Sequence, residues 1–248
     1  MIHNHRITEK VVIIAHRGAN DVEPENTLAA FQKAIEMNCD CVEMDVRCTR
    51  DGVLILMHDS TVNRTTNGSG KVHELTFDEI RSLDAGCRHG SGRNSQPVPT
   101  FDEALEVCKG KVRVYVDDKT DAPERVMTTI KQHQMLDEVI IYGSVENLTT
   151  FKRLYPAVWI MPDHPSTQEE LVWLAHNLHP EALDGNIRDW TPEQVEQAHR
   201  LGIQVWVDNL GENDNPNGFQ RSIEMGVDAI QTDHLGQLLE YLKRAGRR

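Results

Sequence analysis

Short apolar runs alternate with helix-like segments along most of this chain, and this alternation restricts the fold more than any other feature. Strands that alternate with helices favour a parallel sheet built from βα units. A (β/α)8 barrel needs about 250 residues, and the chain has 248 residues. We therefore expect an α/β fold, one TIM (β/α)8 barrel domain over residues 1–248. The eight strand-like runs are residues 11–15, 41–46, 112–117, 139–142, 158–161, 182–183, 203–207 and 227–230.

A ninth apolar run, residues 53–57, follows the second strand too closely for a parallel crossover. Such a crossover needs about a dozen residues, whereas the intervening Asp51-Gly52 is a strong hairpin signal. We expect this run to return antiparallel to residues 41–46 at the rim of the barrel. Simple antiparallel pairing places His58 opposite Glu43, with a register that can slip by a residue or two.

The segment after the hairpin, residues 59–100, contains no good barrel strand. We interpret it as a small insertion that caps the mouth of the barrel. A capping box from Thr76 to Glu79 opens a short helix inside it, and a second box from Thr100 to Glu103 opens the next helix of the barrel.

Apolar residues recur at helical spacing over residues 27–37, directly after the first strand and its loop. Asn26 precedes this segment, and asparagine is a preferred N-cap residue. We therefore predict a helix here that Asn26 caps.

The formal charge of −13 excludes nucleic acid as a partner, because phosphate backbones bind to basic surfaces. An acidic protein that handles a phosphate usually needs a bound divalent cation. No run approaches the roughly 18 apolar residues of a membrane span. Residues 1–10 lack the apolar centre of a signal peptide. We expect a cytoplasmic protein, or one whose export segment was removed from this sequence.

Charged side chains follow three of the apolar strands, at the ends where parallel α/β folds bind ligands. His16 and Arg17 follow the first strand, Glu43 and Asp45 share one face of the second, and the third ends in charge. With the histidine that the hairpin returns, this mouth gathers carboxylates, imidazoles and cations. The predicted site residues are His16, Arg17, Glu43, Asp45, His58, Asp117 and Lys119.

These side-chain types suit metal-assisted chemistry on a phosphate. Acidic oxygen ligands favour Mg²⁺ or Ca²⁺ over zinc, which prefers histidine or thiolate. Two histidines beside a bound phosphate supply a general base and a general acid. Arg17 and Lys119 would bind the remaining phosphate oxygens.

Several motifs in this order resemble the glycerophosphodiester phosphodiesterase family of phosphatidylinositol-phospholipase-C-like TIM barrels. The match covers most of the chain and is strongest over residues 13–86. The resemblance implies a barrel with an insertion after the His-Asp motif, one divalent cation (Mg²⁺, Ca²⁺ or Mn²⁺), and hydrolysis to sn-glycerol 3-phosphate and an alcohol. The matching motifs are Ile14–Gly18, Pro24–Thr27, Glu43–Val46, Asp51-Gly52, His58-Asp59, Arg64–Thr66, Val205–Asp208 and Gly226–Asp233.

The family's residue roles transfer to matching positions. Its two catalytic histidines fall on His16 and His58, and its first two metal ligands on Glu43 and Asp45. Its third ligand, normally glutamate, falls on Asp117, and this shorter side chain leaves metal preference and substrate choice open.

Three further residues near strand ends receive predicted roles. Trp206, at the end of a late strand, is interpreted as a wall against the glycerol or the leaving group, with core packing as the alternative. Asp233 and Asn209 are interpreted as turn residues or as partners of site residues.

Other functions stay open at this stage. One is a lysophospholipase D-like activity on lysophospholipids. A Schiff-base lyase using Lys119 is disfavoured, because Asp117 and Asp118 should raise the pKa of the amine. A non-catalytic barrel that binds head groups has little reason to keep both histidines and three carboxylates. We expect a small-molecule substrate. The sequence leaves open which group is the nucleophile, which alcohol leaves, and whether the protein forms a homo-oligomer.

Overall fold

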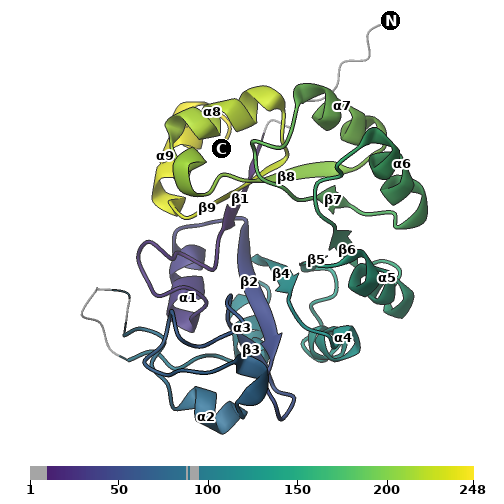
Figure 1. The fold of residues 1–248 in the computed structure, drawn as a ribbon. Coiled ribbons are helices and arrows are strands. Elements are labelled where there is room, and N and C mark those ends of the chain that lie inside the picture. The colour runs from purple at the N-terminus through teal and green to yellow at the C-terminus, as the bar shows by residue number, and fades with distance from the viewer. Residues whose placement is uncertain (1–9, 88, 90–94) are drawn as a thin grey trace, which may run out of the picture.

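A computed structural model describes residues 10–87, 89 and 95–248. In these residues, eight parallel strands lie in the order β6-β5-β4-β2-β1-β9-β8-β7 (Figure 1). The two end strands meet through a parallel bridge between Asp163 and Asp184 and a hydrogen bond from Glu181 N to Ile160 O. The sheet is thus a nearly closed barrel, which confirms the predicted TIM-type fold. The strands are β1 (Val12–Ala15), β2 (Cys41–Cys48), β4 (Arg113–Asp118), β5 (Val139–Tyr142), β6 (Trp159–Met161), β7 (Ala182–Leu183), β8 (Gln204–Asp208) and β9 (Ala229–Thr232).

Helices surround the strands in Figure 1 and pack an apolar face on them. This packing forms the large hydrophobic core between the two layers, as a barrel of this kind requires. In the described part of the chain, no helix combines the length and apolar character that crossing a membrane needs. The helices are α1 (Leu28–Glu36), η1 (Val72–Glu74), α2 (Phe77–Arg81), α3 (Phe101–Cys108), α4 (Pro123–Gln132), α5 (Val145–Leu154), α6 (Gln168–Asn177), α7 (Pro192–Arg200), η2 (Gly211–Asn213), α8 (Pro216–Met225) and α9 (Leu235–Arg244).

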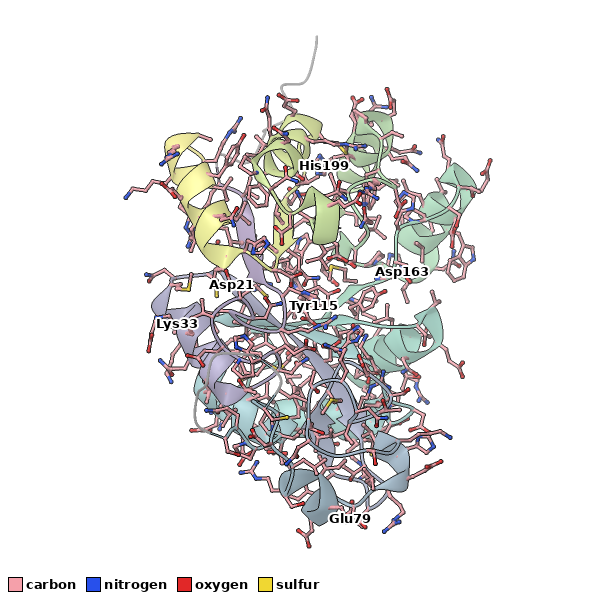
Figure 2. The ribbon with its side chains drawn as sticks, turned by 60° about the vertical axis from the view of Figure 1, so that its left-hand side comes forward. Asp21, Lys33, Glu79, Tyr115, Asp163 and His199 are labelled. Carbon is pink, nitrogen blue, oxygen red and sulfur yellow. The ribbon has the colours of Figure 1, made fainter. Side chains whose placement is uncertain are left out.

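A second, smaller core fills the interior of the barrel. It includes Ile14, Tyr115 and Trp206, and Figure 2 labels Tyr115 near the centre of the molecule. The rings of Tyr115 and Trp206 meet edge to face, with centroids 6.3 Å apart. Strand residues alternate in direction, so Val205 and Val207 face the helices while Trp206 faces inward.

The position of Trp206 corrects the prediction that it forms a wall against the substrate. Its side chain is 0% exposed and donates from Nε1 to Gln204 Oε1 at 2.9 Å. The core-packing alternative describes it, because the alternation of β8 turns this residue into the barrel.

The hairpin after β2 is confirmed. Strand β2 extends past the barrel and pairs with antiparallel β3 (Leu54–Leu56). Val46 lies opposite Leu56, and one further hydrogen bond runs from Met57 N to Asp45 O. This register is one residue away from the predicted one, so His58 returns at the level of Met44 and not of Glu43.

The rim segment, residues 57–100, carries η1 and α2. Its apolar side chains form a separate cluster together with Ile55 of β3. Figure 1 shows α2 at the lower end of the molecule, and β3 lies beside the extended end of β2. Residues 88 and 90–94 of the predicted insertion lie outside the described residues. The members of the cluster are Ile55, Met57, Val62, Val72, Ile80, Ala85 and Val98.

Both predicted capping boxes are present, at Thr76–Glu79 and Thr100–Glu103. The predicted cap of the first helix is wrong by one residue. Thr27 caps α1 by accepting from Ala30 N, whereas Asn26 has a φ of 55° and turns its amide toward Asp45. The side chain of Asn26 therefore binds the site residue Asp45 and does not cap α1.

His199 on α7 binds Asp228, the residue before β9, and Asp228 also accepts from Val205 N at 2.8 Å. Figure 2 labels His199. Its Nε2 lies 2.8 Å from the carboxylate, and the hydrogen bond to Asp228 outweighs burial and raises the pKa of His199. A raised pKa means that the folded protein holds this proton more tightly than the unfolded chain.

We expect the stability from this pair to be complete below the unfolded pKa of about 6.5 and to disappear as the pH rises through the raised folded pKa. His199→Gln should lower the free energy of unfolding by about 1 kcal/mol at pH 5.5 and by less at pH 8. Urea titrations of both proteins at the two pH values measure this. An equal difference at both values would contradict the prediction.

Candidate active site

Three carboxylates meet at the carboxyl end of the barrel. Glu43 and Asp45 lie on the same face of β2, and the parallel register places Asp45 beside Asp117 of β4. Their oxygens lie within 4.8 Å of one another, close enough to hold one metal ion. Glu43 is 2% exposed, Asp45 is 0% exposed and the side chain of Asp117 is 15% exposed, so most of this acidic group is removed from water.

The negative charges of these carboxylates repel one another. Burial, with the charges of Asp45 and Asp117, raises the pKa of Glu43 well above its usual range. Burial likewise raises the pKa of Asp117 to about 6, against the attraction of Lys119. Burial would raise the pKa of Asp45, but the charges of Lys119, Arg17 and His58, with the hydrogen bond from Asn26, lower it. Such a group favours a cation among its members.

The two carboxylate oxygens of Asp45 differ in their hydrogen bonds, and this difference bears on whether a divalent cation fits here. Its Oδ2 accepts from Asn26 Nδ2 at 2.6 Å, while its Oδ1 is buried without a hydrogen-bond partner. Asp45 N donates to Asn26 Oδ1 at 3.1 Å, which fixes the strand and the loop against each other. A buried carboxylate oxygen without a hydrogen bond, beside two more carboxylates, matches the oxygen ligands that Mg²⁺ and Ca²⁺ prefer.

Two cations flank the carboxylates. Lys119 Nζ lies 2.5 Å from Asp117 Oδ2 and 3.3 Å from Asp45 Oδ1. Burial alone would lower the pKa of Lys119, but the carboxylates of Asp117 and Asp45 raise it above its usual value. Arg17 lies on the other side, with Nε 3.4 Å from Asp45 Oδ2.

The turn after β1 brings the backbone of Arg17 to the carboxylates. Arg17 N donates to Glu43 Oε2 at 2.7 Å, and Arg17 itself has a φ of 54°. Gly18 follows with a φ of 83°, and a Cβ there would lie 2.7 Å from the backbone of Ala30. The glycine of the His-Arg-Gly motif is therefore needed both for its backbone conformation and for its contact with α1.

Each predicted catalytic histidine has a carboxylate partner on Nδ1. His16 Nδ1 lies 2.6 Å from Asp233 Oδ1, and His58 Nδ1 lies 2.9 Å from Asp59 Oδ1. A carboxylate at this position holds the proton of a neutral imidazole on Nδ1 and leaves Nε2 as the basic nitrogen. Asp233 is thus a partner of a site residue, one of the two roles predicted for it.

One small cavity of about 160 Å³ brings both histidines together with Arg17, Glu43, Asp45 and Asp117. A second, larger cleft of about 670 Å³ begins at His16 and Arg17 and extends toward the rim segment. Asp21, labelled in Figure 2, lines this cleft. His16 and Arg17 therefore line both spaces.

The small cavity is also lined by residues that were not predicted as site residues: Tyr115, Tyr142, Asp184, Asp208 and Gln231. Burial raises the pKa of Asp184 and of Asp208. Asp208 is the last residue of β8, so the strand-end criterion that found Asp117 also applies to it. Asp184 follows a strand of only two residues, which gives too weak a signal for that criterion.

Comparison with known proteins identifies relatives of this geometry. The family model described as the glycerophosphoryl diester phosphodiesterase family matches residues 16–237. A glycerophosphodiester phosphodiesterase of Caldanaerobacter subterraneus subsp. tengcongensis is 33% identical, over 96% of this chain and 100% of the relative.

Two solved structures have the same fold. The crystal structure of a glycerophosphodiester phosphodiesterase from Agrobacterium tumefaciens has a TM-score of 0.83 at 28% identity and covers 93% of this chain and 99% of that one. An Oleispira antarctica phosphodiesterase, solved with the product sn-glycerol-3-phosphate, has a TM-score of 0.86 at 24% identity, covering 94% and 96%. The family model spans most of the sequence, and the first relative aligns over its whole length, so the chain belongs to the glycerophosphoryl diester phosphodiesterase family.

Proposed function

We propose that this chain hydrolyses glycerophosphodiesters to sn-glycerol 3-phosphate and an alcohol, with one divalent cation and with His16 and His58 as the acid–base pair. The observation that carries the proposal is the 160 Å³ cavity that both histidines share with three carboxylates. Membership of the family and the full-length relative support the substrate class.

Glu43, Asp45 and Asp117 would hold the cation. Their donors are oxygens only, which suits Mg²⁺ or Ca²⁺, with Mn²⁺ as a further choice. When bound, such an ion polarises the phosphoryl oxygens and stabilises the charge that develops on them. The role of the amide of Asn26 is to orient Asp45 through two hydrogen bonds.

Arg17 and Lys119 would bind the anionic phosphate. Both side chains stand beside the carboxylates, and both carry a pKa above the usual value for their type. They keep positive charge in a protein whose formal net charge is −13. The ion pairs of Lys119 also keep its amine protonated, which is unsuitable for a Schiff-base nucleophile.

The two histidines would transfer the protons of the reaction. One removes a proton from the nucleophile, either water or a glycerol hydroxyl of the substrate, and the other protonates the leaving alkoxide. If the glycerol hydroxyl attacks, a cyclic phosphate forms, and water then opens the ring to give sn-glycerol 3-phosphate. Asp233 and Asp59 stabilise the imidazolium form that each histidine passes through. The 670 Å³ cleft beside His16 also has room for a larger leaving group, so lysophospholipids belong in a substrate panel.

Replacing either histidine should remove acid–base catalysis. We expect His16→Ala and His58→Ala each to lower kcat on glycerophosphoethanolamine by about 10²- to 10⁴-fold. His176→Ala, on the exposed side of α6, serves as the control and should retain activity. Near wild-type turnover in both site variants would remove the histidines from the mechanism.

Chelation tests the cation. Activity should disappear in EDTA and return when Mg²⁺, Ca²⁺ or Mn²⁺ is added. Asp45→Asn should weaken metal binding, measured by calorimetric titration, by at least about tenfold, while Asp102→Asn, at an exposed position of α3, should leave the titration unchanged. A titration of Asp45→Asn that matches the wild type would take Asp45 out of the ligand set.

The length of residue 117 should affect the choice of metal. Asp117→Glu adds one methylene and moves the carboxylate toward the cation site, so the order of activity with Mg²⁺, Mn²⁺ and Ca²⁺ should change. Asp117→Asn removes the charge and should weaken binding of all three. An unchanged metal order in Asp117→Glu, at equal activity, would show that this position does not set the preference.

A further inference from the structure

Arg64, in the rim segment, connects two loops that carry site residues. Its Nε and Nη2 each lie 2.9 Å from an oxygen of Asp59, and its Nη1 and Nη2 lie 2.6 and 2.8 Å from the oxygens of Glu25. We infer that Arg64 is a positioning residue for His58, because it fixes the carboxylate that binds the imidazole and ties it to the loop after β1. This inference rests on the proposed function for the role of His58.

The first link is Asp59, which lies between the arginine and the histidine. Its Oδ1 accepts from both His58 Nδ1 and Arg64 Nη2, and its Oδ2 accepts from Arg64 Nε. The hydrogen bonds from Arg64, with a smaller effect of His58, hold the pKa of this carboxyl well below its usual range. Asp59 therefore stays ionised and oriented by two contacts to one planar guanidinium.

The second link is Glu25, which is shared by two arginines. It binds Arg64 through both oxygens and accepts from Arg17 Nη1 at 2.9 Å. The neighbouring Asn26 holds Asp45. Arg64 thus joins the rim segment to the same loop that orients the carboxylates of the barrel.

His58 needs such support more than His16 does. His16 directly follows barrel strand β1 and its side chain is 11% exposed, whereas the side chain of His58 lies beyond the pairing of β3 and is 39% exposed. The backbone of His58 is held by Arg47, whose Nε and Nη2 donate to its carbonyl at 3.0 and 2.7 Å. The ring is oriented by Asp59, whose own orientation depends on Arg64.

The rim segment offers a matched control. Arg81 binds Glu103 through two contacts of 2.7 and 2.8 Å, the same kind of paired guanidinium–carboxylate contact. Arg81 also donates to Val98 O, and among the described residues none of its hydrogen-bond partners lines the small cavity. Arg81→Gln therefore removes a comparable ion pair from the same segment and leaves the contacts of His58 in place.

Steady-state kinetics on glycerophosphoethanolamine, with metal present, test the inference. Arg64→Gln should lower kcat by about 10- to 100-fold, the loss expected when a catalytic group is misplaced, with KM changed by less than about threefold. Arg64→Lys should fall between, because lysine lacks the planar fork. Arg81→Gln should keep wild-type kcat. Equal losses of kcat in Arg64→Gln and Arg81→Gln, or a rise in KM alone from direct substrate contact, would overturn it.

A measurement without substrate separates this inference from the proposed function. In ¹⁵N-labelled protein, the His58 signal, assigned by its loss in His58→Ala, should report the Nδ1–H tautomer in the wild type and in Arg81→Gln. It should shift toward the other tautomer in Arg64→Gln. Inactivity of the wild type on glycerophosphodiesters would refute the proposed function, whereas an unchanged His58 signal in Arg64→Gln would refute the role of Arg64.

Discussion

Repulsion among three carboxylates, two of them buried and one partly buried, is the constraint on which the site depends. Parallel pairing of β2 with β4 leaves Asp45 and Asp117 side by side, with Glu43 on the same face. Burial makes their negative charges costly, and the surrounding structure offsets that cost. The left-handed turn at Arg17 brings its backbone N–H to Glu43. Asn26 donates to Asp45 and does not cap α1. Lys119 forms an ion pair with Asp117, two residues before it.

The barrel and the rim contribute differently to the site. The barrel supplies His16 and the acidic group from paired strands, whose positions are fixed by the sheet and by two apolar cores. The rim supplies His58 from a short antiparallel return, with its position maintained by polar contacts of Asp59 and Arg47. The position of His16 thus depends on the sheet and the cores together with its contact to Asp233, whereas the position of His58 depends on hydrogen bonds and ion pairs.

Sequence patterns predicted the features that local rules determine. Alternation placed Glu43 and Asp45 on one face, strand ends located Asp117, and the Asp-Gly turn gave the hairpin. The errors concern a register, a side-chain partner and a side-chain direction. The hairpin register was off by one residue, Asn26 was drawn to a strand distant in the sequence, and the inward direction of Trp206 depended on the phase of β8. Asp184 was missed because β7 has only two residues.

The separate apolar cluster of the rim segment has a consequence for how such an enzyme can diversify. Ile55, Val62 and Ile80 pack among themselves and their neighbours, apart from the core beneath the barrel helices. Arg64 and Thr65, carried by the same segment, line the large cleft. Substitutions in this cluster therefore reshape the cleft wall before they disturb the barrel, which lets selectivity evolve with little change in the scaffold that holds the acidic group.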